Sequence, residues 1–293
     1  MAENLLRLPD SRDLCYQFYG PVDGDAVLYF HGTPSSRLEI QLLKGFDVDV
    51  DSLLSEAKLK LIAVDRSGMG LSTFNVMGNF LTFADDVKQL TEFLNIINCS
   101  VLCWSGGGPY ALAIAHQYPA LIKSVFIICG FSRSFDKEVL RQMGMNKWYF
   151  RSAKYSPWLL RMALNVIKRK HLKKIVPQKW TGLPYVDYAL LKDPVHLNAV
   201  ARNTIKEACR KGARGAVFEA KSYYNEFGFQ LSKIQQPVHF WWGTEDMTVI
   251  RLHAEAVERQ IPNSVMHYKN GEGHLSVYVN YMKEVFQEIS RIY

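Results

Sequence analysis

The sequence of 293 residues lacks several features that mark membrane, secreted or metal-binding proteins. No apolar run approaches the ~20 residues of a membrane-spanning helix. The N-terminus lacks the basic region and the apolar stretch of a signal peptide, so we do not expect secretion by that route. The five cysteines are odd in number and have no metal-site spacing. These absences predict a cytoplasmic protein with reduced cysteines.

Repeats and low-complexity segments are also absent, and acidic residues are scarce in one part of the chain. Residues 131–222 contain 20 Lys and Arg but only 6 Asp and Glu. The remainder has 15 Lys and Arg and 22 Asp and Glu, so the two parts carry charges of +14 and −7. This split indicates a separate domain. No nucleic-acid-binding motif accompanies the positive charge, so nucleic acid is not an expected partner.

Short apolar runs alternate with helical patterns along most of the chain, which predicts an α/β fold. Buried strands are expected at 26–30, 60–64, 100–103, 124–129, 237–242 and 265–268, and edge strands at 5–8 and 14–19. Such alternation is typical of a mainly parallel, eight-stranded sheet with helices on both faces. Residues 131–222, below called the insertion, break the alternation with consecutive helices. We therefore predict a core of residues 1–130 and 223–293 with a helical lid (cap) at 131–222.

A turn in the stretch 99–117 is typical of a nucleophilic serine. Ser105 follows a predicted buried strand and precedes a predicted helix, with the small residues Cys103 and Gly107 two positions away on either side. Only small residues there let strand and helix approach closely, and the strained turn then exposes the hydroxyl beside backbone N–H groups. The alternatives are a glycine-rich turn that only reverses the chain and a phosphate-binding loop, but no Lys follows the glycines, which disfavours the latter.

Two residues that can activate such a serine follow later strands. Asp246 comes soon after the strand 237–242, and His274 comes after the last strand. Reacting groups in a parallel sheet gather at the carboxyl ends of the strands, so we expect Ser105, Asp246 and His274 to meet there. The imidazole would take the serine proton, and the carboxylate would orient the imidazole. Glu245 is the competing acid.

A catalytic serine also needs donors for the oxyanion that forms on its substrate. The backbone N–H of Gly106 is one candidate, and the N–H of Thr33, in the loop after the strand 26–30, is the other. Gly32 lets this loop approach closely, and we place Gly32, His31 and Trp104 in or beside the substrate pocket. His31 is expected to brace the loop rather than to act as a second base.

These motifs resemble the α/β-hydrolase superfamily, in the lidded branch that holds esterases, proline-iminopeptidase-like enzymes and haloalkane-dehalogenase-like proteins. The resembling segments are His31–Pro34, Asp65–Ser72, Cys103–Gly107 and Gly273-His274. The resemblance implies a hydrolase that uses neither a metal nor an organic cofactor. Ser rather than Asp at position 105 disfavours dehalogenase and epoxide hydrolase chemistry.

The insertion is expected to cover the substrate pocket and to determine which substrates bind. Its many aromatic residues suggest a partly apolar substrate. The stretch Pro157–Val176 is basic and amphipathic, and Leu159, Met162, Ala163 and Val166 could form one apolar face. This stretch is either an ordinary lid helix with a solvated charged face or a contact with an anionic membrane surface.

We therefore predict a serine hydrolase that cleaves a carboxylic ester of a small to medium, partly apolar substrate through an acyl-enzyme. A proline-iminopeptidase-like amidase is the alternative enzyme, and it would be favoured if Glu207 or Glu219 of the insertion pointed into the pocket. A ligand-binding receptor with little turnover is the alternative outside enzymes. The sequence leaves the acid, the alcohol and the oligomeric state open.

Overall fold

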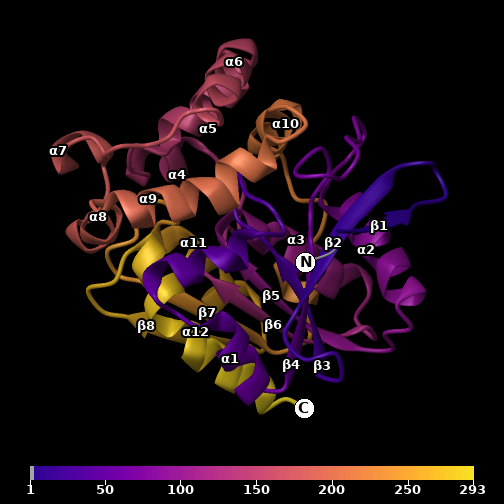
Figure 1. Ribbon diagram of the computed structural model, residues 1–293. Helices are drawn as coiled ribbons and strands as arrows, with labels where there is room; N and C mark the ends of the chain where they lie inside the picture. Colours follow the sequence, from indigo (N-terminus) through magenta and orange to yellow (C-terminus); the bar gives the residue numbers. More distant parts are fainter. Residues whose placement is uncertain (1–2) are drawn as a thin grey trace.

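The computed structural model describes residues 3–293 and contains the expected eight-stranded sheet (Figure 1). The strands are β1 (Asn4–Arg7), β2 (Asp13–Tyr19), β3 (Asp25–Phe30), β4 (Leu59–Val64), β5 (Cys99–Trp104), β6 (Ile122–Ile128), β7 (Val238–Gly243) and β8 (Ser264–Lys269). Their order is β1-β2-β4-β3-β5-β6-β7-β8, and β2 pairs antiparallel with both β1 and β4. All other neighbours are parallel, so the predicted α/β architecture is confirmed.

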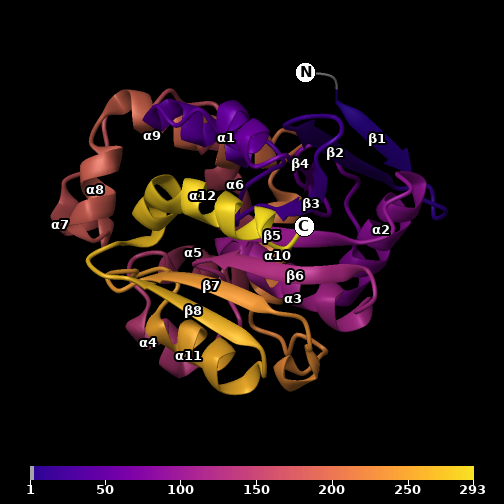
Figure 2. The same cartoon turned by 90° about the horizontal axis from the view of Figure 1, so that it is seen from below.

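Helices cover both faces of the sheet, which explains why the central strands are continuous apolar runs. One face carries α1 (Val50–Glu56) and α12 (His274–Ser290), and the other carries α2 (Phe80–Phe93), α3 (Gly108–Gln117) and α11 (Arg251–Gln260) (Figure 2). Asn79 caps α2, and Thr82 completes a reciprocal capping box with it.

The insertion lies between β6 and β7 and runs along one end of the sheet (Figure 1). It contains α4 (Lys137–Gln142), α5 (Lys147–Tyr155), α6 (Pro157–Ile167), α7 (Gln178–Thr181), α8 (Tyr185–Leu191), α9 (Pro194–Ala201), the π-turn Arg202–Lys206 and α10 (Arg214–Ser222). The amphipathic stretch Pro157–Val176 is helical only in its first part, because α6 ends at Ile167. Beyond that point Arg169/Lys173 and Lys170/Lys174 would be like-charge pairs one helical turn apart, which destabilise a helix.

Across residues 3–293, none of the helices combines the length and the apolarity that crossing a bilayer requires. The sheet and its flanking helices share a large apolar core. A smaller buried cluster joins Met69 of the core to Leu164, Cys209 and Ala216 of the insertion. The insertion is therefore packed onto the end of the sheet where β5 ends.

Candidate active site

Ser105 lies at the sharp turn between β5 and α3. Its φ is +52°, in the left-handed region that a residue with a Cβ rarely adopts. The next residue has no room for a side chain, because a Cβ on Gly106 would lie 2.6 Å from both Thr33 Cγ2 and Tyr223 Oη. The turn after β5 and the loop after β3 are therefore in close contact, and Thr33 and Gly106 are neighbours in space.

His274 begins α12, and its ring is hydrogen-bonded to Asp246. Nδ1 of His274 lies 2.8 Å from Oδ2 of Asp246, whose side chain is completely buried. Oδ1 of Asp246 accepts hydrogen bonds from the N–H groups of Thr248 and Val249, at 2.7 and 2.8 Å. Burial lowers the pKa of His274, but the charge and hydrogen bond of Asp246 outweigh that effect and raise it. The imidazole therefore binds a proton more readily than an ordinary histidine.

Ser105 and His274 both line a cavity of about 300 Å³ beneath the insertion. The lining residues from the core are Gly32, Thr33, Pro34, Ser35, Glu39, Trp104, Ser105, Thr248 and His274. Those from the insertion are Phe131, Asn146, Tyr149, Phe150, Leu164, Val200, Thr204 and Ile205. Within residues 3–293 the serine hydroxyl and the imidazole are not hydrogen-bonded to each other.

The ring of Trp104 packs against the imidazole of His274 and holds its plane. Its ring stacks on His274 with centroids 5.2 Å apart and on Tyr278 with centroids 4.4 Å apart. The indole Nε1 donates to the carbonyl oxygen of His274 at 3.4 Å. Trp104 therefore lines the cavity, and its indole contacts both the ring and the backbone carbonyl group of His274.

The loop after β3 is held by a buried carboxyl group that the sequence analysis missed. Both carboxyl oxygens of Glu39 accept the N–H of Gly32, at 2.9 and 2.8 Å, and Oε1 also accepts the hydroxyl of Tyr29 at 2.6 Å. Burial raises the pKa of Glu39 to about 7. Glu39 lies in a short 3₁₀ helix, Glu39–Phe46, and borders the cavity.

His31 lies beneath this loop, outside the lining of the cavity. It is fully buried, and its Nε2 accepts the backbone N–H of Arg66 at 3.3 Å. The guanidinium of Arg66 donates to the carbonyl oxygens of His31 and Gly32. His31 and Arg66 therefore brace the loop, whereas Gly32 and Thr33 reach the cavity.

Asp187 from helix α8 of the insertion binds the start of α12. Its Oδ2 accepts the N–H of His274 at 2.7 Å, and its Oδ1 accepts the N–H groups of Leu275 and Ser276 at 3.1 and 2.9 Å. This approach needs a glycine before the histidine, because a Cβ on Gly273 would lie 2.5 Å from the Asp187 carboxylate. The insertion therefore supplies the cap of the helix that carries His274.

The two insertion acids considered as amine-binding groups are both paired with arginines. Glu219 accepts from Arg66 Nε at 2.6 Å and Nη2 at 2.8 Å and is almost completely buried. Glu207 accepts from Arg37 at 2.8 Å and Arg210 at 3.3 Å. Neither carboxylate lines the cavity with Ser105.

Cys129, Asp246 and His274 bring possible metal-ligand atoms within 4.8 Å of one another. A thiol binds a metal as its thiolate, but burial beside Asp246 raises the pKa of Cys129 well above its usual value. Both oxygens of Asp246 already accept hydrogen bonds. The donor set therefore fits a hydrogen-bonded carboxylate and imidazole better than a metal ion.

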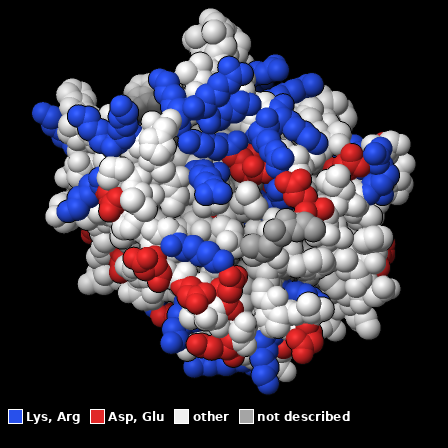
Figure 3. Space-filling model, viewed as in Figure 1, with Lys and Arg blue, Asp and Glu red and all other residues white. Residues whose placement is uncertain are grey.

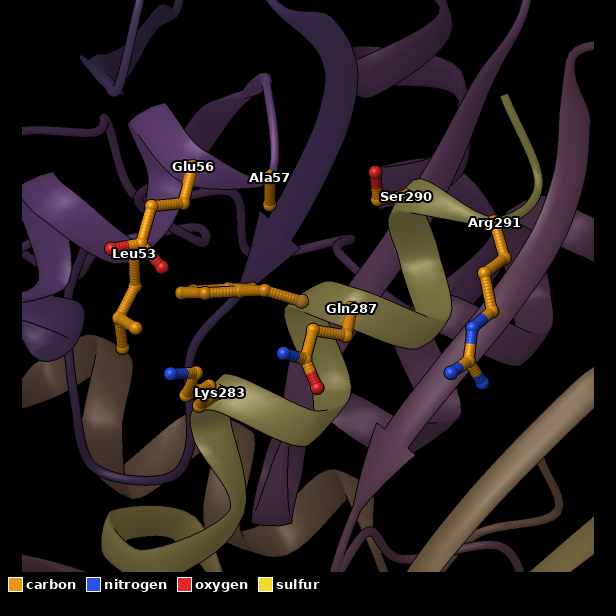
Figure 4. A pocket seen from close by; sticks show the side chains of 8 residues that line it. Leu53, Glu56, Ala57, Lys283, Gln287, Ser290 and Arg291 are labelled. Atoms are coloured by element: carbon orange, nitrogen blue, oxygen red, sulfur yellow. The ribbon is translucent and has the colours of Figure 1, made fainter.

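A second cavity, of about 440 Å³, lies between α1 and α12 (Figure 4). Its lining residues are Leu53, Glu56, Ala57, Lys283, Phe286, Gln287, Ser290 and Arg291. It shares no residue with the Ser105 cavity and contains no paired nucleophile and base, so its larger volume does not make it the better candidate.

Curated relatives match parts of the chain. A putative proline iminopeptidase from Mycoplasma genitalium is 30% identical over 154 residues, which cover 51% of this chain and 47% of that protein. The sn-1-specific diacylglycerol lipase ABHD11 from Xenopus laevis is 28% identical over 112 residues, which cover 38% of this chain and 34% of that protein. The chain therefore spans less than half the length of these two relatives.

Solved structures match over nearly the whole chain. A carboxylesterase structure from the ammonia-oxidizing Thaumarchaeon Nitrososphaera gargenis has a TM-score of 0.72 and 20% identity, and the match covers 98% of this chain and 96% of that one. At this identity the likeness shows the fold. The family model for the alpha/beta hydrolase fold matches residues 25–281. The chain therefore belongs to the α/β-hydrolase fold family.

Proposed function

We propose that this α/β-hydrolase is a serine esterase, which cleaves a carboxylic ester of a small to medium, partly apolar substrate. The observation that carries the proposal is the 2.8 Å hydrogen bond between Asp246 and the ring of His274, on a cavity that also contains Ser105. A nucleophile, a base and an orienting acid are the three groups that acyl transfer needs.

In the first half of the reaction, Oγ of Ser105 attacks the ester carbonyl and His274 takes the hydroxyl proton. The N–H groups of Thr33 and Gly106 bind the resulting oxyanion, and the close contact between their loops supports this pairing. The C–O bond to the alcohol then breaks, and His274 returns the proton to the leaving oxygen. This step leaves an acyl group on Ser105.

In the second half, a water molecule gives a proton to His274 and attacks the acyl carbon. The bond between that carbon and Oγ of Ser105 then breaks, and His274 returns the proton to Oγ, which releases the acid and restores the serine. We expect the hydroxyl of Ser105 and the imidazole of His274 to form a hydrogen bond when substrate fills the cavity, because catalytic hydrogen bonds are often long in substrate-free sites. The raised pKa of His274 makes its ring a stronger base for both proton transfers.

The cavity also guides the choice of substrate. Its volume of about 300 Å³ is at the small end of ligand pockets, and most of the side chains contributed by the insertion are apolar. Arginine partners neutralise Glu207 and Glu219, which leaves neither of them to hold a free amine. This pairing favours a neutral ester over the aminopeptidase substrate suggested by the name of the Mycoplasma genitalium relative.

Turnover of p-nitrophenyl butyrate by the wild type and by Ser105→Ala tests the proposal. We expect the variant to lose at least about 10³-fold in kcat/KM while its melting temperature stays within a few degrees. Undiminished turnover by the variant would exclude Ser105 as the nucleophile. Prolyl-naphthylamide as a second substrate separates the amidase, and fluorophosphonate labelling without steady turnover would indicate a receptor instead.

We also propose a cytoplasmic location. All five cysteines are buried and unpaired, as is usual in a reducing compartment.

A further inference from the structure

Helix α6 is apolar on two opposite sides. Leu164 is buried on the inner side, where it lines the Ser105 cavity. The outer side exposes Trp158, Leu159, Met162 and Val166, whose exposed fractions are 63, 49, 61 and 53%. Three of these four residues belong to the apolar face expected from the sequence, but that face is turned to solvent. Side chains of this size rarely cluster on a free protein surface without a partner.

An apolar groove continues this face toward the core. It has a volume of about 320 Å³ and joins the start of α6 to α10 and to the loop 74–76. Its lining residues are Phe74, Val76, Pro157, Trp158, Arg161, Arg214, Val217, Phe218 and Lys221. We call this groove and the outer side of α6 the outer patch.

The border of the outer patch is strongly cationic. Arg161, Arg214 and Lys221 line the groove, and none of the three has an ion-pair partner among residues 3–293. Arg214 lies over the ring of Phe74, with its guanidinium carbon 4.1 Å from the centroid. The stretch 139–186 contains eleven Lys and Arg and no Asp or Glu. Figure 3 shows Lys and Arg side chains gathered next to the uncharged tip of the insertion.

We propose that the outer patch is a docking surface for a membrane that contains anionic lipid. Trp and aliphatic side chains enter the boundary between headgroups and acyl chains, while Lys and Arg at their border contact anionic headgroups. A second copy of the chain fits this surface poorly, because a symmetric contact would press the cations of two insertions together. Nucleic acid would pair with the cations but leave Leu159, Met162 and Val166 in water.

Docking through α6 would bring the membrane close to the Ser105 cavity. The inner side of α6 contributes Leu164 to the wall of that cavity, and a helix with its side chains is about 10 Å thick. An apolar molecule leaving the bilayer would then have a short path to the site. The docking surface itself does not depend on the proposed esterase activity.

Sedimentation of the full-length protein with lipid vesicles tests the docking surface. We expect binding to vesicles of phosphatidylcholine with phosphatidylserine, little binding to vesicles of phosphatidylcholine alone, and weaker binding at high salt. Trp158→Asp with Met162→Asp removes the apolar contact and should abolish binding. Arg161→Gln with Lys221→Gln should weaken binding about fivefold for each cation removed.

Ile97→Asp is the matched control, because Ile97 is 87% exposed on the core, away from the insertion. It should bind as the wild type does, and circular dichroism should show that all variants are folded. Several results would overturn the proposal: no binding to phosphatidylserine vesicles, equal binding to neutral vesicles, or unchanged binding of the Trp158/Met162 variant. Self-association through the outer patch would also overturn it. So would binding of decanoate, a free fatty acid, by a protein that does not bind vesicles.

Discussion

Replacing Asp187 by Asn tests whether the insertion positions the base of the proposed reaction. The carboxylate of Asp187 accepts three N–H groups at the start of α12. The amide of Asn keeps one acceptor oxygen and turns an NH₂ group toward at least one of these donors. An unpaired buried N–H costs about 1–3 kcal/mol, and the lost charge at a helix start costs up to about 2 kcal/mol.

Part of this cost is recovered, because the charged carboxylate of Asp187 is itself expensive to bury. Burial outweighs the hydrogen bonds from the three N–H groups and raises the pKa of Asp187. We expect a net loss of about 2 kcal/mol, which lowers the melting temperature by roughly 4–8 °C. Because His274 is one of the three donors, its ring should shift within the site. A misplacement near 1 Å costs up to about 10²-fold in rate, so kcat/KM should fall about 10–100-fold.

The assay is p-nitrophenyl butyrate turnover across a range of pH, well below the melting temperature of the variant. The charge of Asp187 helps to raise the pKa of His274, so the acid limb of the Asp187→Asn profile should lie at lower pH. Asp193→Asn is the control, since Asp193 caps α9 on the surface and Asn caps equally well. Full activity of Asp187→Asn with only a lower melting temperature would refute a positioning role.

Three further substitutions test the remaining parts of the site. Asp246→Asn removes the charge that raises the pKa of His274, so kcat should fall about 10⁴-fold and the acid limb of the residual activity should move to lower pH; an unmoved limb would mean that another group titrates. Gly106→Ala puts a Cβ 2.6 Å from Thr33 Cγ2 and Tyr223 Oη, so kcat should fall about 10²-fold through the displaced N–H donors; normal turnover would remove Gly106 from the oxyanion site. The folded-state pKa of Glu39, about 7, lies above its ordinary value of 4.5, so between these values the folded protein binds more protons than the unfolded chain. The wild type should therefore lose about 3 kcal/mol of unfolding free energy relative to Glu39→Gln as the pH rises from 4.5 to 7; denaturant unfolding with parallel pH profiles for the two proteins would contradict this.

The fold was predictable because buried parallel strands and their covering helices have distinct periodicities. The same rule predicted that Asp246 and His274 would meet, since both follow strands that end at one edge of the sheet. Small residues around Ser105 likewise indicated the turn that the structure contains.

Other parts of the site carry no local signal in the sequence. Asp187 comes from a distant helix and binds backbone N–H groups, which are the same for any residue. Glu39 lies in a short 3₁₀ helix, and a carboxyl group beside apolar residues is ordinarily expected to face solvent, so the sequence gives no sign of its burial. Helix α6 has two apolar sides, and periodicity alone cannot tell which of them faces the core.

The ion pair between Arg66 and Glu219 limits how substrate reaches the cavity. Arg66 belongs to the core and Glu219 to α10, and both side chains are almost completely buried. Swinging the whole insertion outward would separate two desolvated charges, and breaking a buried pair costs about 3–5 kcal/mol. Substrate entry is therefore cheaper by a local movement that leaves α10 anchored to the core than by displacement of the whole insertion.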